Sequence, residues 1–400
     1  MEKRQKRTLL KLLLGQSLLL VSFSVFSVVL FYLLEKDYYA NSIILGTFGM
    51  ITALPPALIA IGAPMLDNIS HIKLKLIVLQ IVSSIGILLG GLSLLIHFSL
   101  VVVGLFYFII SVTTTVSGSI EVSFIPMIFD QDEDKIEHSV DLQYFLGSGI
   151  TVLIGIIASI SLLKVGSFNL LLISFISAPL GIICYINIHH SENQVGLNGD
   201  ENVDLSYFKK MIKELNQFVT TMPAFIIILF EAILGGLSGL LMDLMPLTMK
   251  EIGVPIALFA LVSSVQKAGD FMGGFLAPLV KMKASNFFIL DYLVSGFCIY
   301  LISFNLPNPV RLLLLLVSGV VMGMSGNVFE KLMYRSYNVG DVSSMHALTT
   351  STFSLFSVIG LFAAWIKVDT LKLWQITGIV TIVFAVLLVL IMKKISQKDI

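Results

Sequence analysis

The sequence is built from long apolar runs separated by short polar connections, and this pattern sets the fold class. A helix that crosses the hydrocarbon core of a bilayer needs about 20 apolar residues. Twelve runs meet this requirement, at 9–34, 40–64, 74–97, 100–128, 140–163, 169–188, 218–241, 256–280, 285–305, 311–333, 344–366 and 373–392. Pro64, Pro255, Pro307, Pro309 and Gly166 are expected to break the chain between runs. The pattern predicts an all-α integral membrane protein with twelve transmembrane helices.

Composition supports this fold class and excludes several functions. Apolar residues make up 56% of the 400 residues and charged residues only 12%, whereas soluble domains average about 25% charged. The zero net charge gives no basic surface for nucleic acid. Cys184 and Cys298 each lie inside an apolar run and are expected to be core residues rather than ligands or a disulfide. The basic start at 1–7 precedes a run too long for a signal peptide, so we expect a retained first helix.

No chemical signature of an enzyme is present. The sequence contains no phosphate-binding loop, nucleophile elbow, HExxH motif or Gly-rich dinucleotide signature. The adjacent His189 and His190 point about 100° apart on a helix, and the acidic residues at 130–134 lack EF-hand spacing. We therefore expect no catalytic residue, no metal and no cofactor.

One long polar stretch divides the chain near its middle. It covers 189–217, and its second part has the pattern of a short amphipathic helix on the membrane surface. The expected organisation is an N-terminal six-helix bundle at 1–190, a cytoplasmic linker at 191–217 and a C-terminal six-helix bundle at 218–400. We expect a monomer in the lipid bilayer.

The distribution of Lys and Arg predicts the orientation. Of the 25 Lys and Arg residues, 18 fall on the side of the N-terminus, six fall on the other side, and Lys267 lies within a span. Basic residues are enriched in cytoplasmic loops. Both termini are therefore expected on the cytoplasmic side of the cell membrane.

The loop between the second and third runs carries a recognisable motif. Ala63, Asp67, Lys73 and Lys75 follow the order small residue, acid and two basic residues around a tight turn. This arrangement resembles the signature loop of the major facilitator superfamily, with Asn68 where an Arg usually stands. The segment 273–283 looks like the second, decayed copy, with Pro278 in the acidic position. Asp67 can accept backbone N–H groups or pair with Lys73 in one conformation only, which predicts a gating role; the alternative is a solvated loop residue.

Two further patterns resemble the drug-efflux branch that includes macrolide exporters. They are Ser123-Phe124-Ile125-Pro126-Met127 and Leu153-Ile154-Gly155, the latter followed by Ile156 instead of the usual proline. The resemblance implies two six-helix bundles and a central cavity lined by the first, fourth, seventh and tenth helices. It also implies export by alternating access.

Glu231 is the first candidate for proton coupling. It lies about 14 residues into the seventh run, which is roughly 20 Å along a helix and near the membrane centre. Gly235 and Ser238 share its face. Charges at this depth are costly and usually functional, and burial favours the protonated form of a carboxyl. The alternative is a permanently protonated, structural Glu.

Lys267 and Asp270 in the eighth run lie one turn apart and can pair within the helix. A self-neutralised pair without a role in transport is one interpretation. In the other, Lys267 meets Glu231 from the neighbouring helix, and a substrate or proton competes for that bond. Asp291 and Asp141 are expected nearer the inner interface, packed against cytoplasmic lysines.

Further polar residues are candidates for the cavity. Thr114, Ser117 and Glu121 share one face of the fourth run, and Glu121 belongs either to the gate around Lys73 or to the cavity and proton coupling. The remaining candidates are Gln16 in the first run and Asn327 and Glu330 in the tenth.

The sequence therefore predicts a secondary active transporter that exports a small, largely apolar compound, coupled to protons. The Phe- and Met-rich helices suit an adaptable pocket. The alternatives are a nutrient uptake permease and a non-transporting membrane sensor or immunity protein, the latter suggested by Asn68 and Ile156.

Overall fold

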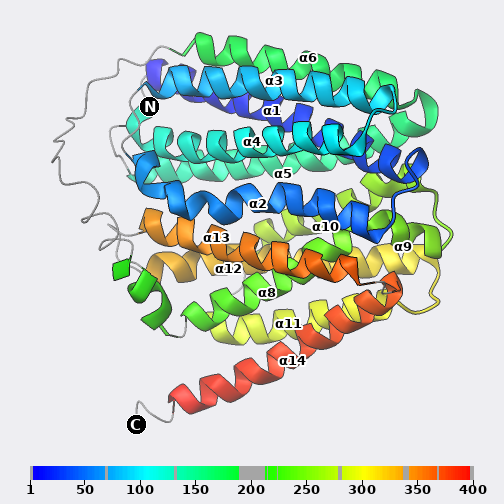
Figure 1. The fold of residues 1–400 in the computed structure, drawn as a ribbon. Coiled ribbons are helices and arrows are strands. Elements are labelled where there is room, and N and C mark those ends of the chain that lie inside the picture. Colours follow the sequence, from blue (N-terminus) through cyan, green and yellow to red (C-terminus); the bar gives the residue numbers. More distant parts are fainter. Residues whose placement is uncertain are drawn as a thin grey trace. The chain divides into compact units, whose positions relative to one another are not determined.

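The computed structural model describes residues 3–67, 71–129, 133–188, 212–213, 215–222, 224–277, 282–336, 342–366 and 369–396. Within these ranges the chain is helical apart from short connections. Figure 1 shows the order of the helices along the chain. The first six are α1 (Lys3–Lys36), α2 (Ser42–Asp67), α3 (Ile72–Leu95), α4 (Leu100–Ile128), α5 (Glu133–Lys164) and α6 (Ser167–Ile186).

The second half of the chain is also helical. Its helices are α8 (Ala224–Asp243), the short α9 (Met245–Glu251), η1 (Ile256–Leu258), α10 (Phe259–Leu276), α11 (Ala284–Ile302), α12 (Asn308–Ser336), α13 (Val342–Leu361), η4 (Phe362–Trp365) and α14 (Thr370–Ser396). Each of the twelve predicted spans coincides with one long helix, although several ends differ by more than four residues.

Ten helices among the described residues are long and apolar enough to cross a membrane. The other two long helices are α5, whose apolar stretch covers only Gly149–Leu162, and α10, which is 18 residues long and contains Gln266, Lys267 and Asp270. The charges that mark α10 as a functional candidate are therefore also what lowers its hydropathy. The prediction of an all-α membrane protein is confirmed.

Helix ends follow the expected breakers, with one correction. Gly166 precedes α6 with a φ of 87°, a left-handed conformation that favours glycine. Pro255 precedes η1, and Pro307 and Pro309 lie at the start of α12. Pro64, however, lies inside α2 and does not end it. Membrane helices tolerate an internal proline because neighbouring groups satisfy the freed backbone carbonyl.

The chain forms two compact units. The first contains Met1–Ala40 and Leu54–Tyr207, and the second contains Asn41–Ala53 and Phe208–Ile400. The start of α2 thus groups with the C-terminal helices. The predicted linker at 191–217 lies mostly outside the described residues.

Within the first unit, α1 packs against α6 and α3 packs against α4 (Figure 1). Leu12, Leu76, Phe129 and Tyr185 belong to its core. Within the second unit, α8 packs against α13, and α11 lies beside α14 (Figure 1).

Close contact between α10 and α12 depends on four glycines. A Cβ atom at Gly269 or Gly273 would collide with the backbone of α12, and one at Gly319 or Gly323 would collide with the backbone of α10. Small residues allow membrane helices to approach at backbone distance. This contact fixes α10, and with it Lys267 and Asp270, against α12.

Candidate functional site

The second unit contains a group of polar side chains that we call the C-terminal acid cluster: Glu231 on α8, which is half-buried, and Asp291 and Tyr292 on α11 and Ser325 on α12, which are buried. Asp291 is only 3% exposed. Its Oδ2 accepts a hydrogen bond from the Ser325 hydroxyl, and its Oδ1 has no hydrogen-bond partner. The hydroxyl of Ser325 on the neighbouring helix and that of Ser295 on its own helix therefore both lie beside this acid.

Glu231 and Tyr292 complete the cluster. Tyr292 is 1% exposed, and its hydroxyl lies next to the Glu231 carboxyl but outside hydrogen-bond geometry. Glu231 also interacts electrostatically with Asp291. Around them, Phe230, Phe288 and other core side chains form an apolar shell. The hydroxyl of Tyr292 lies beside Glu231, and the hydroxyls of Ser325 and Ser295 lie beside Asp291.

The position of Glu231 differs from the sequence expectation. Because α8 begins at Ala224 rather than near residue 218, Glu231 is seven residues from the helix start, which is about 10 Å rather than roughly 20 Å. Asp291 is likewise seven residues from Ala284 at the start of α11. Each of the two acids therefore lies two turns after the start of its own helix.

Lys267 and Asp270 pair within α10, as one interpretation of the sequence expected. Lys267 Nζ lies 3.6 Å from Asp270 Oδ2, and the two side chains are 54% and 30% exposed. The alternative contact of Lys267 with Glu231 is wrong for this structure, since no ion pair joins these two described residues. Asp270 is one turn away and accessible to solvent or lipid headgroups, so pairing with it requires no burial of the ammonium group.

The first unit holds a second group, the N-terminal acid cluster: Gln16 on α1, Ser117 and Glu121 on α4, and Tyr185 on α6. Glu121 is 5% exposed. It accepts hydrogen bonds from the Tyr185 hydroxyl and from Ser117 Oγ at 3.4 Å. The Gln16 side chain faces the same carboxyl, although its buried Nε2 lies outside hydrogen-bond geometry.

Local sequence explains how this cluster assembles. The Tyr185 ring fits against Gly15, where an added Cβ would lie 2.7 Å from the ring. Glu121 therefore lies inside the core of the first unit. Thr114, expected on the same face, instead bonds its own helix, with its hydroxyl 2.9 Å from the Ile110 carbonyl oxygen and 3.0 Å from that of Ser111.

The predicted gating residues are only partly described. Lys73 donates to the Ile188 carbonyl oxygen at 2.9 Å, and Lys11 donates to the Asn187 carbonyl oxygen. Both cations thus satisfy carbonyl groups just after the end of α6, where the helix dipole favours positive charge. Lys75 is exposed. The Asp67 side chain lies outside the described residues, so its pairing with Lys73 stays a prediction.

The structure says little about three of the predicted cavity residues. Ser238 is half-buried on α8, while Asn327 and Glu330 lie on α12 with side chains outside the described part of the chain. Sequence reasoning named Asp291 but did not include it in the site, and it missed Tyr292, Tyr185 and Ser325. An acid in the middle of an apolar run was a usable signal for Asp291; for the tyrosines and Ser325 no sequence signal distinguishes a buried partner from an ordinary core residue.

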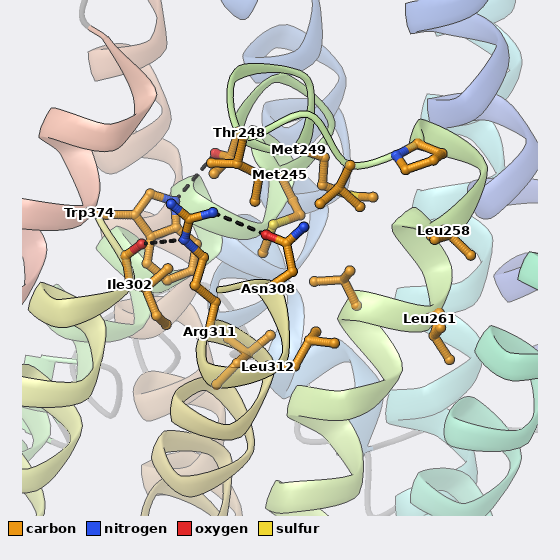
Figure 2. A pocket seen from close by; sticks show the side chains of 15 residues that line it. Met245, Thr248, Met249, Leu258, Leu261, Ile302, Asn308, Arg311, Leu312 and Trp374 are labelled. Carbon is orange, nitrogen blue, oxygen red and sulfur yellow. Dashed lines mark hydrogen bonds between the residues drawn. The ribbon is translucent and has the colours of Figure 1, made fainter. Parts of the chain in front are cut away.

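The second unit also contains a separate pocket of about 210 Å³. It is lined mostly by apolar side chains of α9, α10 and α12, including Met245, Met249 and Leu261 (Figure 2). Its polar groups have partners. Trp374 Nε1 donates to Thr248 Oγ1 at 3.3 Å, and Arg311 donates to the Ile302 carbonyl, to Asn308 Oδ1 and to the Phe304 carbonyl, at 3.2, 3.1 and 2.8 Å. The Arg311 contacts tie the end of α11 to the start of α12.

No protein-family model and no curated protein matches the sequence. Solved structures match over nearly the whole chain. The nucleoside transporter NupG is 12% identical, with a TM-score of 0.71 over 96% of this chain and 99% of its own. A POT family transporter in complex with a thioalcohol-conjugated peptide is 11% identical, with a TM-score of 0.75 over 97% and 96%. A D-xylose–proton symporter is 13% identical, with a TM-score of 0.69 over 96% and 95%. The chain is thus a multi-pass membrane protein with the major facilitator fold.

Proposed function

We propose that this protein is a secondary active transporter that exports a small, largely apolar compound by alternating access and exchanges it for protons. The observation that carries the proposal is the C-terminal acid cluster, in which a buried carboxyl, Asp291, and a half-buried one, Glu231, lie in the apolar helices of a major facilitator fold. Carboxyls inside membrane helices are costly and commonly mark ion or proton pathways. The chain has no residues arranged for catalysis or cofactor binding in its sequence, which favours transport over an enzymatic role.

In this proposal Glu231 is the main protonation site. It interacts with Asp291 and Tyr292, and no basic side chain contributes to its described surroundings. Exposure of the carboxyl to water during the transport cycle stabilises its ionised form, and closure stabilises the protonated form. Opening of the protein then releases the proton, and this couples proton movement to transport. Asp270 and Glu121 are the next candidates, and Lys267 balances the charge of Asp270.

The direction of transport rests on the resemblance of 123–127 and 153–155 to drug exporters. A second candidate, uptake of a nutrient, is favoured by the likeness to the D-xylose–proton symporter and the nucleoside transporter. In both cases we expect both termini on the cytoplasmic side of the cell membrane. Labelling of single cysteines placed in the 191–217 linker of intact cells tests this; reaction with an impermeant reagent from outside would contradict the topology.

Proton flux in lipid vesicles that contain the purified protein separates the functional alternatives. A panel of apolar drugs, sugars and nucleosides is added outside, and an enclosed pH-sensitive dye reports proton movement. An exporter that exchanges its compound for protons moves the protons in the direction opposite to the compound. A proton-coupled uptake permease moves the protons in the same direction as the compound. If no compound of any class moves or stimulates a proton signal, the transport proposal fails in favour of a sensor or immunity protein.

A further inference from the structure

The pocket of about 210 Å³ in the second unit combines an apolar interior with one charged side chain. Among the lining residues that the structure describes, Arg311 alone carries a charge, and most of the others are aliphatic side chains or methionines. Figure 2 shows the Arg311 head group on one side of the pocket and Leu258 and Leu261 on the other. The pocket therefore has a cationic end and an apolar end.

Arg311 retains donors beyond the bonds that hold it in place. Its Nε and one N–H of each terminal nitrogen donate to two backbone carbonyls and to the Asn308 side chain. A guanidinium has five N–H groups, so each terminal nitrogen keeps one more. All three acceptors are neutral, and no carboxylate among the described residues forms an ion pair with Arg311. Glu251 of α9 instead accepts from the Thr370 hydroxyl at 2.6 Å.

The volume of the pocket limits the size of a ligand. An engineered apolar cavity of about 150 Å³ holds one benzene ring, and by the same ratio this pocket holds about eight carbon atoms. An unfilled apolar pocket leaves its lining atoms without dispersion partners, so an apolar chain of this size fits it favourably. Arg311 lies three residues after Asn308, the start of α12, which is about 5 Å from the helix end. A charged head group therefore reaches it without crossing the membrane core.

We propose that this pocket binds a short amphipathic carboxylate, an aliphatic acid of about eight carbon atoms such as octanoate. Its chain lies among the apolar side chains, and its two carboxylate oxygens accept from the remaining N–H groups of Arg311. Hydrogen bonds between a guanidinium and a carboxylate are charge-assisted and strong. The site is separate from both acid clusters and goes beyond the proposed transport function. A protein that transports nothing would still bind this ligand.

Trp374 provides a reporter inside the pocket. The chain has two tryptophans: Trp374 lines the pocket and is buried, whereas Trp365 is exposed. In a Trp365→Phe variant reconstituted in lipid vesicles, all tryptophan emission comes from Trp374. The probe is 8-bromooctanoate, because bromine quenches an indole at short range. We expect quenching that saturates and that unlabelled octanoate reverses.

The role of the charge is tested on the same folded protein with a neutral ligand. The amide, 8-bromooctanamide, keeps the chain and the bromine but loses the charge-assisted bonds to Arg311. We expect its half-saturating concentration to be at least about tenfold higher than that of the carboxylate. Simple partitioning into the bilayer predicts the reverse order, since the neutral amide enters lipid more readily.

A matched pair of substitutions tests the location of the chain. Leu261→Phe adds volume at the apolar end of the pocket and should raise the half-saturating concentration of 8-bromooctanoate at least about tenfold. Leu313→Phe makes the same change at an exposed position of α12 that does not line the pocket, and it should leave binding unchanged. Both are made in the Trp365→Phe background.

Four results would overturn the proposal. They are quenching that does not saturate, quenching by the amide at the same or a lower concentration than by the carboxylate, unchanged binding in a folded Leu261→Phe variant, and occupation of the pocket by a membrane lipid. The last is measured in vesicles of phosphatidylcholine with brominated acyl chains. If these lipids quench Trp374 and octanoate relieves the quenching, the natural occupant is a lipid chain and not a short carboxylate.

Discussion

The two acid clusters place the same kind of side chain in opposite circumstances. In the N-terminal acid cluster, Glu121 receives hydrogen bonds from Tyr185 and Ser117 and faces Gln16. In the C-terminal acid cluster, Ser325 donates to Asp291, Ser295 lies beside the same carboxyl, and Glu231 faces Tyr292, whose hydroxyl lies outside bonding geometry. An acid with several donors is suited to joining helices, and an acid such as Glu231, whose neighbouring hydroxyl lies outside bonding geometry, is suited to binding a proton. The comparison therefore predicts that the environment of each acid, rather than its burial alone, decides its role.

The two clusters should differ most in gradient-driven transport when one Glu in each is replaced by Gln. Glu231→Gln should abolish accumulation of compound driven by a pH gradient while leaving exchange without a gradient, because the amide mimics the protonated acid and cannot release a proton. Glu121→Gln should keep most of the gradient-driven accumulation, since an amide oxygen still accepts from Tyr185. Radiolabelled uptake or efflux in vesicles measures both. Gradient-driven transport by Glu231→Gln at the wild-type rate would move the coupling site to Asp270 or Glu121.

Removing one tyrosine hydroxyl from each cluster should affect stability unequally. Tyr185→Phe leaves a buried carboxyl without its closest donor, which costs about 1–3 kcal/mol. Tyr292→Phe removes a hydroxyl that makes no hydrogen bond, so the free energy of unfolding should change by less than about 0.5 kcal/mol. Thermal unfolding of the two variants in the same detergent compares them. Equal destabilisation would show that the Tyr292 hydroxyl has a structural partner.

Replacing one serine in each cluster should also affect stability unequally, by smaller amounts. Ser325→Ala removes the hydroxyl that donates to Asp291 and should lower stability by about 1–2 kcal/mol. Ser117→Ala removes a contact of 3.4 Å to Glu121, near the limit for a hydrogen bond. Because Tyr185 still donates to Glu121, the free energy of unfolding should fall by less than about 0.5 kcal/mol. Unfolding midpoints at neutral pH measure both. A larger loss for Ser117→Ala would reverse the assignment of the two clusters.

The Lys267–Asp270 pair should give the smallest effect. Lys267 is 54% exposed, and exposed ion pairs contribute about 0–1 kcal/mol because solvent and salt screen them. Lys267→Met together with Asp270→Asn should leave stability and proton coupling near wild-type values. Transport assays in vesicles decide this, and loss of coupling in a folded double variant would restore the pair as a functional element.

Hydropathy was sufficient to predict the helices because the bilayer imposes a length and a composition on each span. The run at 100–128 coincides with α4, and the run at 256–280 is shortened to α10 after η1. The partners of the acids were not predictable in the same way. Sequence spacing gives the face of a residue on its own helix, but the rotation of each helix against its neighbours follows from side-chain packing.

Asp291 illustrates this limit. It was expected beside cytoplasmic lysines, of which Lys331 has its side chain outside the described residues, and it is buried with Ser325 because α11 packs against both α12 and α14. Glu121 shows the converse: its face with Ser117 was correctly anticipated, but Tyr185 is 64 residues away in sequence and only the packing of α6 brings it close. The small Gly15 that admits its ring has no distinguishing pattern of its own.

The central claim is that the exchangeable proton binds at Glu231 and not at Glu121. The most direct test counts the protons that cross the vesicle membrane for each molecule of a transported compound, in the wild type, Glu231→Gln and Glu121→Gln. We predict a fixed number of protons per compound for the wild type and for Glu121→Gln, and none for Glu231→Gln even though it still exchanges the compound. An unchanged proton count in Glu231→Gln, or its loss only in a folded Glu121→Gln, would contradict the account.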